Sequence, residues 1–148
     1  MSLQEQIMDQ MKTAMKAKDT VALESLRAIK SAILLARTSG AGGSLSEADE
    51  TKLVQKLVKQ RKDSAAIFTE QGRDDLAAPE LAQAAIIEQF LPEQLTEAEI
   101  EKVVVQTIDV LGAEGMKDMG KVMGMVSKEL AGQADGKTIS AIVKNKLS

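Results

Sequence analysis

The chain has 148 residues, of which 44% are apolar and 28% charged, and this balance is typical of one globular domain or two small helical lobes. The absence of cysteine and histidine excludes disulfides, the usual zinc sites, thiol nucleophiles and imidazole bases, and the net charge of −3 argues against a general nucleic-acid binder. Only Phe68 and Phe90 are aromatic, so aliphatic side chains must fill the core, and such a composition favours helices over sheets.

Two helices are predicted at the start of the chain. Ser2 and Glu5 form an S-x-x-E capping box, which predicts a helix running to about Lys18. Asp19 is a candidate N-cap for a second helix, which we expect to end before Ser39. Apolar residues recur at helical spacing through both segments and predict their inward faces. These residues are Leu3, Ile7, Met11, Ala14, Val21, Leu26, Ile29, Ala32 and Ile33.

A glycine-rich segment, residues 39–44, separates the second helix from the third, and we expect it to be mobile. Ser46 with Asp49 opens a third, longer helix, and Gly72 is its expected stop. The inner side of this helix is expected to carry a run of apolar residues at helical spacing. They are Leu53, Val54, Leu57, Val58, Ala65 and Phe68.

Two prolines mark the fourth predicted helix. Proline is well placed in a first helical turn, so Pro79 predicts a start at Asp75 or Ala78. Pro92 is expected to end the helix, because proline cannot continue it. The expected inward face consists of Leu81, Ala84, Ile87 and Phe90 or Leu91. The same proline marks the expected boundary between two lobes.

The C-terminal part begins with a second clear capping box, Thr96 with Glu99, and the helix that follows is expected to stop at Gly112. The inward face of this fifth helix is Ile100, Val103, Val104, Ile108 and Leu111. The remaining stretch, residues 116–147, predicts two short amphipathic helices joined by a turn at 132–136.

In that last pair, Asp135 is the expected N-cap of the final helix and Gly132 the stop of the helix before it. The buried faces are expected to be Met119, Val122, Met123, Val126 and Leu130, then Ile139, Ile142, Val143 and Leu147. Met125 lies off this stripe and is expected to be exposed, while most other methionines here fill the core. The predicted fold is therefore all-α, with an N-terminal four-helix lobe, residues 1–92, and a small three-helix bundle, residues 93–148.

Gly120 and Gly124 lie one turn apart on one face of the sixth predicted helix. Nearby charged residues exclude a membrane-helix dimer. Two glycines inside a helix cost about 1 kcal/mol each relative to alanine, so they need a reason. We expect close packing against a neighbouring helix of the same bundle. The alternative is a bare patch that a phosphate backbone can approach, flanked by Lys121 and Lys128.

Charge is distributed unevenly along the C-terminal part. Residues 93–114 contain six acids and one lysine, whereas residues 115–148 contain six lysines and three acids. The opposed signs either attract each other within one bundle, or the basic part faces an anionic partner. Lys52, Lys56 and Lys59 align on one helix face, which we expect to be solvated, with RNA-backbone contact as the alternative.

No constellation of catalytic residues is found. The segment 132–138 looks like a phosphate-binding loop, but it has three residues between its glycines instead of four and follows a helix instead of a strand. A serine nucleophile would need a lysine base and an oxyanion loop, and no convincing set occurs. The residues therefore predict a binding module with no catalytic residue, no metal site and no cofactor.

The run DMGKVM at 118–123, followed by an Ala-Asp-Gly-Lys turn and a short Ile/Val helix, resembles the YqeY-like family. A similar helical unit forms the C-terminal tail of the B subunit of tRNA-dependent amidotransferases (GatB). The resemblance covers nearly the whole chain and includes 14–19, 26–27, 31–33, 59–64, 72–73 and 90–95. One departure is Gln83-Ala84-Ala85, where the resemblance implies an acidic residue.

The resemblance implies an all-helical N-terminal lobe followed by a small three-helix lobe. In amidotransferase B subunits the similar tail helps to hold the tRNA while misacylated Glu-tRNA or Asp-tRNA is amidated by a kinase-like domain that this sequence does not contain. The family is associated with carbon–nitrogen ligases that use glutamine as amido-nitrogen donor, but we expect no enzymatic activity from this chain alone. The residues implied to face tRNA are Gly120, Lys121, Gly124, Lys128 and Lys137.

The expected partners follow from the same resemblance. They are tRNA and, with it, an amidotransferase or an aminoacyl-tRNA synthetase, in the context of translation. No DNA partner is expected. No apolar leader and no apolar run near the ~20 residues of a membrane span are found, so a cytoplasmic location without a membrane partner is expected. The alternative function is a protein-interaction adaptor that docks through the methionine and glycine face.

Overall fold

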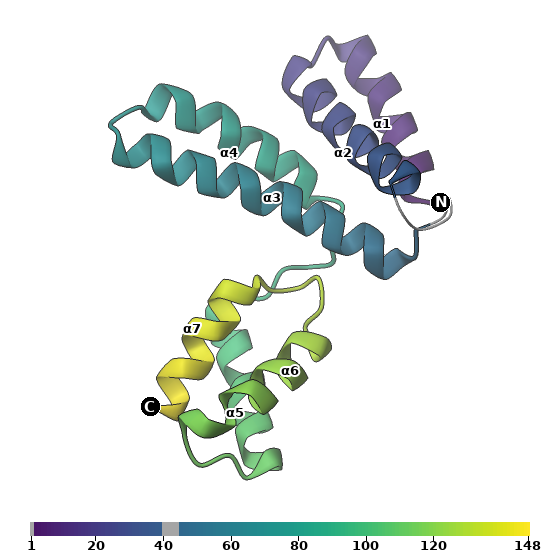
Figure 1. Cartoon of the computed structure of the whole chain (residues 1–148). Coiled ribbons are helices and arrows are strands. Elements are labelled where there is room, and N and C mark those ends of the chain that lie inside the picture. Colours follow the sequence, from purple (N-terminus) through teal and green to yellow (C-terminus); the bar gives the residue numbers. More distant parts are fainter. Residues whose placement is uncertain (1, 40–44) are drawn as a thin grey trace. The chain divides into compact units, whose positions relative to one another are not determined.

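A computed structural model describes residues 2–39 and 45–148, and in these residues all regular structure is helical (Figure 1). The all-α prediction is confirmed. Residues 40–44, most of the segment expected to be mobile, lie outside the described part. The elements are α1 (Leu3–Ala17), α2 (Thr20–Thr38), α3 (Glu47–Glu70), α4 (Asp74–Glu88), α5 (Glu97–Leu111), the 3-10 turn η1 (Met116–Asp118), α6 (Met119–Glu129) and α7 (Gly136–Leu147). The chain divides into two compact units, Met1–Leu91 and Pro92–Ser148.

Five helices begin at the caps that the sequence predicts. In each case the cap's side chain accepts a hydrogen bond from a backbone N–H in the first turn, which satisfies one of the donors left free at a helix start. These caps are Ser2, Asp19, Ser46, Thr96 and Asp135. Such a cap stabilises a helix by about 1 kcal/mol, so the helix starts are determined locally.

The fourth helix differs from the prediction at both ends. It begins at Asp74, one residue before the first predicted start, because the Arg73 carbonyl already accepts hydrogen bonds from the N–H groups of Leu76 and Ala77 at 3.0 and 3.1 Å. A start at Ala78 is therefore wrong, and Pro79 lies inside the helix instead of in its first turn. The helix ends at Glu88, a turn before the proline expected to stop it.

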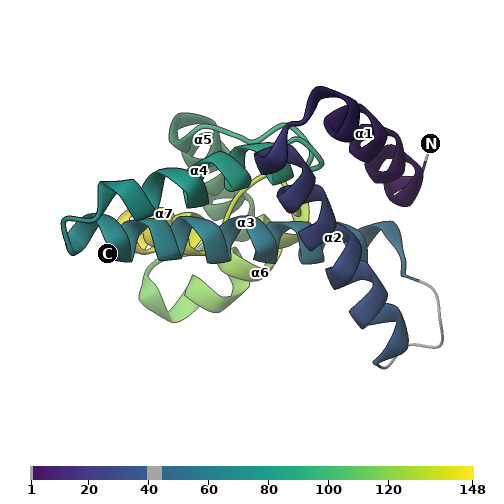
Figure 2. The same cartoon turned by 90° about the horizontal axis from the view of Figure 1, so that it is seen from above.

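In the first unit, α1 packs on α2, and α2 packs on α3 and α4, which form the most extensive helix pair. Figures 1 and 2 both show α3 and α4 side by side and antiparallel. The core of this unit contains residues from all four helices: Ile7, Ala14, Leu26, Ile29, Ile33, Val54, Val58, Ala84 and Ile87.

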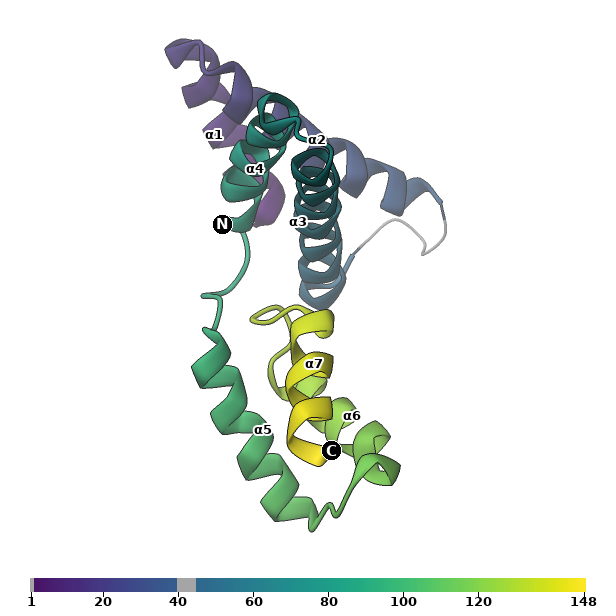
Figure 3. The same cartoon turned by 90° about the vertical axis from the view of Figure 1, so that its left-hand side faces the viewer.

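In the second unit, α5, α6 and α7 each pack on the other two (Figure 3). Their shared core consists of Ile100, Val104, Val122, Val126, Leu130, Ala134, Ile139, Val143 and Leu147. The three helices therefore bury one face each and leave the opposite faces to solvent. Among the helices described, none has the length and apolar character needed to cross a membrane.

Three residues predicted to face inward are exposed. Val21 lies one residue off the stripe that α2 buries, in which Ala22 packs against the core in its place. Leu81 is 50% exposed, because Ala77, Ala84 and Ile87 set a stripe on α4 that passes beside it. Leu111 closes α5, beyond the last residues of that helix that reach the core.

Candidate functional site

The outer face of α6 is bare at its two glycines. Gly120 and Gly124 are exposed, and a Cβ atom built on either would have no heavy atom within 4 Å apart from the neighbouring backbone of α6 itself. The expected close packing of these glycines against a neighbouring helix of the bundle is therefore wrong. The physical reason is that Val122 and Val126, both fully buried, point to the opposite side of α6 and make the contacts with α5 and α7.

Lys121 and Lys128 lie on the same outer face as the glycines, two turns apart, and both are exposed. Lys137 is exposed in the first turn of α7, at the other end of the short connection that follows α6. In the described part of the chain no ion pair involves any of these three lysines. The structure thus places four of the five candidate residues on one helix face and Lys137 at the start of the next helix.

The connection between α6 and α7 is held by a residue that the sequence does not single out. The side-chain amide of Gln94 donates hydrogen bonds to the carbonyl oxygens of Gly132 at 2.6 Å and Pro92 at 2.8 Å. The Leu95 N–H also donates to the carbonyl of Gln133 at 2.9 Å. No local pattern could reveal this, because Gln94 and Gly132 are 38 positions apart in sequence. These bonds fix the turn from which α7 and Lys137 start.

Gly132 itself is buried with a φ of 81°, in the left-handed region that favours glycine. Three residues later, Asp135 accepts a hydrogen bond from the N–H of Lys137 at 3.3 Å. The turn is therefore a helix–helix connection with an aspartate cap, as predicted, and its likeness to a phosphate-binding loop is superficial. In the described residues no group of three or more acidic side chains is arranged to hold a metal ion.

The basic and acidic halves of the second unit meet at one point. Lys146 in α7 forms an ion pair with Glu101 in α5, with Nζ and Oε1 2.6 Å apart. This pair supports the interpretation that the opposed charges attract each other within the bundle. It uses only one of the six lysines of residues 115–148, so the alternative of an anionic partner stays open for the others.

Methionine adds apolar surface to the same helix face. Met125 is 46% exposed beside Gly124, as predicted. Met119 and Met123 are half-buried against the core, as predicted, whereas Met116 is exposed in η1. The outer face of α6 therefore combines bare backbone, two free cations and one flexible thioether.

The lysines of α3 have mixed surroundings. Lys52, Lys56 and Lys59 are exposed, consistent with a solvated helix face. The neighbouring Arg61 is instead half-buried, and its Nε donates to Oε1 of Gln83 in α4 at 3.1 Å.

Gln83 also donates through Nε2 to Glu24 at 3.3 Å. A carboxylate at position 83 could accept a hydrogen bond from Arg61, but it could not donate one to the carboxylate of Glu24. The two negative charges would also repel each other. Gln83 therefore joins α2, α3 and α4 through two side-chain hydrogen bonds.

A family model described as Yqey-like protein matches residues 4–147. The chain belongs to this family. A protein of Thermococcus gammatolerans, named as one of the subunits of glutamyl-tRNA(Gln) amidotransferase, is 33% identical over 103 residues, which are 67% of this chain but 16% of that protein.

Fungal proteins named altered inheritance of mitochondria protein 41, mitochondrial, are also similar. The protein of Meyerozyma guilliermondii is 36% identical over 80% of this chain and 63% of its own length. The protein of Saccharomyces cerevisiae strain YJM789 is 31% identical over 87% of this chain and 68% of its own length. The chain thus spans about a sixth of the Thermococcus protein and about two thirds of the fungal relatives.

Proposed function

We propose that this chain is a tRNA-binding accessory module of tRNA-dependent amidation or of other tRNA metabolism, and that it has no enzymatic activity alone. The observation that carries this proposal is the open face of α6, where Gly120 and Gly124 leave the helix backbone bare beside Lys121 and Lys128. A face without Cβ atoms admits a sugar–phosphate chain closely, and flanking lysines neutralise its phosphates.

The mode of recognition follows from the residues that are present. The chain has no tyrosine or tryptophan, and both phenylalanines lie in the first unit, so the α6 face has no aromatic platform on which bases could stack. Contacts with phosphates and with RNA shape remain, and these position a nucleic acid without reading its sequence. The name of the Thermococcus relative, which mentions glutamyl-tRNA(Gln), supports tRNA as the class of ligand.

The test is binding of the purified chain to total tRNA across a salt series, with duplex DNA as competitor. We expect micromolar binding that prefers tRNA and weakens linearly in the logarithm of salt concentration. Changing Lys121→Glu together with Lys128→Glu should reduce the affinity for tRNA by about tenfold or more. The slope of the logarithm of the binding constant against the logarithm of salt concentration should also become shallower by about one to two.

The matched control is Arg27→Glu with Lys30→Glu on α2, two exposed positions, which changes net charge equally on the other unit. Equal losses in both double variants, or no preference for tRNA at low salt, would contradict the proposal for α6. Formation of an amide on Glu-tRNA by the purified chain alone would contradict the proposed lack of enzymatic activity.

A second candidate function is a protein adaptor that docks on an amidotransferase or a synthetase through the same helix face. The exposure of Met125 beside Gly124 favours it, because a flexible thioether next to bare backbone suits packing against another protein. Binding of this kind should tolerate salt and should be weakened by Met125→Ser more than by the lysine changes. We keep the cytoplasm as the proposed compartment, whereas the names of the fungal relatives state that those proteins are mitochondrial.

A further inference from the structure

Two large apolar side chains of α1 are about half exposed and do not belong to the core of the first unit. Met8 is 48% exposed and Met15 60% exposed, and they lie two turns apart on one stripe of the helix. The adjacent side of α1, about a quarter turn away, is already used, because Ile7 and Ala14 are buried against the rest of the unit. The stripe therefore leaves apolar surface uncovered along most of the helix.

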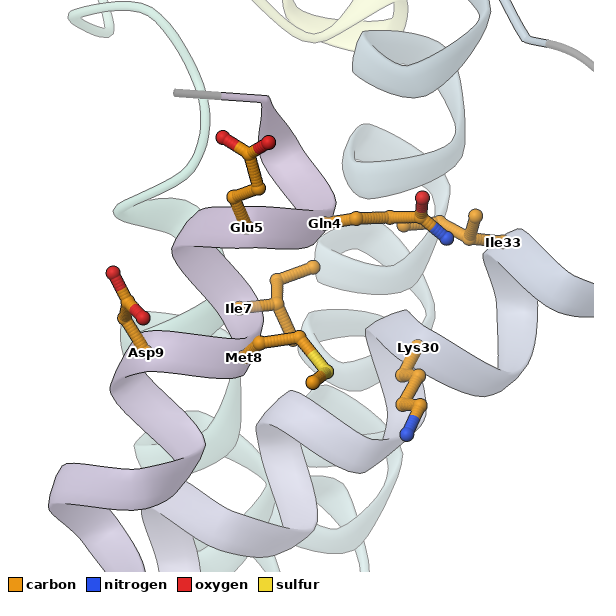
Figure 4. A pocket seen from close by; sticks show the side chains of 7 residues that line it. All are labelled: Gln4, Glu5, Ile7, Met8, Asp9, Lys30 and Ile33. Atoms are coloured by element: carbon orange, nitrogen blue, oxygen red, sulfur yellow. The ribbon is translucent and has the colours of Figure 1, made fainter.

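A groove of about 410 Å³ lies beside Met8, between α1 and α2. Its apolar lining comes from Ile7, Met8 and Ile33, and Lys30 of α2 forms part of its rim. Figure 4 shows Met8 between the two helices, with Asp9 pointing away from Lys30 on the far side of α1. At Met8 the stripe borders this groove, which Glu5 and Asp9 also line, and the charged residues of α1 lie on the other side of the stripe.

Those charged residues form a row along α1 in a defined order. Glu5, Asp9, Lys12 and Lys16 follow at spacings of four, three and four residues, so they lie on one side of the helix, acids first and lysines second. In the described residues no ion pair involves any of them.

The helix dipole favours acids in the first turn and bases in the last turn, but its effect fades within one turn. It accounts for Glu5 and Lys16 and leaves Asp9 and Lys12, in the middle of the helix, unexplained.

The order of these charges is self-complementary. If a second copy of α1 lies antiparallel on the first, Glu5 faces Lys16 of the second copy and Asp9 faces Lys12 of the second copy. Both pairs are centred on the same point between positions 10 and 11, as a two-fold axis requires. In a parallel pair each acid would face an acid and each lysine a lysine, which is repulsive.

We propose that two copies of this chain associate through α1, antiparallel, around a two-fold axis near positions 10 and 11. In this arrangement Met8 of one copy faces Thr13 of the second copy, and Met15 of that copy lies two residues further along, so the methionine stripes of the two copies lie next to each other. Antiparallel pairing thus covers the apolar stripe and satisfies the charge row together. Because α1 has 15 residues and is roughly 22 Å long, the contact is small and the association is transient.

The test is sedimentation equilibrium of the full chain at low salt, over a concentration range that reaches the millimolar. We expect the apparent mass to rise from 15.8 kDa for one chain towards twice that value. Asp9→Lys alone or Lys12→Asp alone should weaken self-association about tenfold, because each change creates two like-charged contacts across the axis.

Two rescues distinguish this pairing from other causes. The double variant Asp9→Lys with Lys12→Asp should associate like the wild type, because it exchanges the two charges. An equimolar mixture of the two single variants should form a mixed dimer, since one chain then offers two lysines and the other two aspartates. Circular dichroism of every variant should show unchanged helix content, because both positions are exposed.

The antiparallel orientation of the two α1 helices can be tested separately by cysteine crosslinking, because the chain has no cysteine of its own. Under mild oxidation, Met8→Cys mixed with Met15→Cys should give a crosslinked pair, and either variant alone should give far less. A wild-type protein that stays monomeric at millimolar concentration would overturn the proposal, and the methionine stripe would then have to bind a partner other than a second copy. Single charge variants that associate as strongly as the wild type, or a crosslink mainly within the Met8→Cys variant, would overturn it as well.

Discussion

Arg73 and Asp75 form a two-bond fork at the start of α4. The Nε of Arg73 lies 3.1 Å from Oδ1 of Asp75, and its Nη2 lies 3.0 Å from Oδ2. The guanidinium lowers the pKa of the Asp75 carboxyl below its usual value, and the carboxylate raises the pKa of Arg73. Both groups are exposed to solvent, so the fork contributes little to the stability of the folded chain.

The sign of its pH dependence is nevertheless defined. Because folding lowers the pKa of Asp75, the fork stabilises the protein above the unfolded pKa near ~4, and this contribution is lost as pH falls through the lower folded value. We expect Asp75→Asn to lower the melting temperature slightly at pH 6 and to leave it unchanged near pH 2. The measurement is thermal unfolding followed by circular dichroism from pH 6 to pH 2.

The matched control for this change is Asp74→Asn. Asp74 also lies in the first turn of α4, but in the described residues it forms no ion pair. Its substitution should therefore change the pH dependence less than Asp75→Asn does. A stability difference between wild type and Asp75→Asn that persists at pH 2 would show that the carboxylate does not act through its charge.

At the scale of the element, substitution of a glycine in α6 is expected to change helix stability and tRNA binding in opposite directions. A methyl group at Gly124 meets no atom, so Gly124→Ala should stabilise α6 by about 1 kcal/mol through helix propensity alone. The same methyl group narrows the bare face, so we expect this variant to bind tRNA more weakly although it melts at a higher temperature. Thermal unfolding and tRNA titration of the same preparation test both parts.

Gly112→Ala is the contrasting control, because Gly112 has a φ of 64° at the end of α5. Alanine there is strained, and we expect a loss of about 1 kcal/mol of stability without an effect on the α6 face. Stabilisation by Gly124→Ala with undiminished tRNA binding would show that close approach to this glycine is not required.

At the scale of the whole molecule, each compact unit has its own hydrophobic core. Ile29 is fully buried in the first unit, so Ile29→Ala should cost about 2–5 kcal/mol through lost burial and the cavity left behind. We expect the loss to appear as faster hydrogen exchange at amides of residues 2–39 and 45–91, with protection retained in residues 92–148. Hydrogen exchange resolved by residue makes the measurement.

Leu35→Ala supplies the control on the same helix, because Leu35 is exposed and makes no core contact. The hydrogen-exchange rates of Leu35→Ala should equal those of the wild type within experimental error. Equal loss of protection in both units of the Ile29→Ala variant would mean that the two cores do not unfold separately.

The sequence alone determines what depends on neighbours three or four residues apart. Helix starts at Ser2, Asp19, Ser46, Thr96 and Asp135 were predictable, because a cap bonds to an N–H in the next turn. The all-helical class follows in the same way from propensity and apolar spacing. The candidate residues on α6 could be placed on one face for the same local reason, although their contact with tRNA stays a prediction.

Only the tertiary structure decided which side of each helix is covered. Leu81 is an example. Apolar residues occur on several sides of α4, and the packing against α3 buries the stripe next to Leu81 and leaves Leu81 exposed. Gly120 and Gly124 are a second example, and one that bears on function. Their spacing suits either a buried contact or an open face, and because Val122 and Val126 pack against the core, the glycine face stays open. The bond from Gln94 to Gly132 joins distant positions, so no local pattern reveals it. Long-range packing, which local spacing does not encode, therefore set the surface on which the proposed function rests.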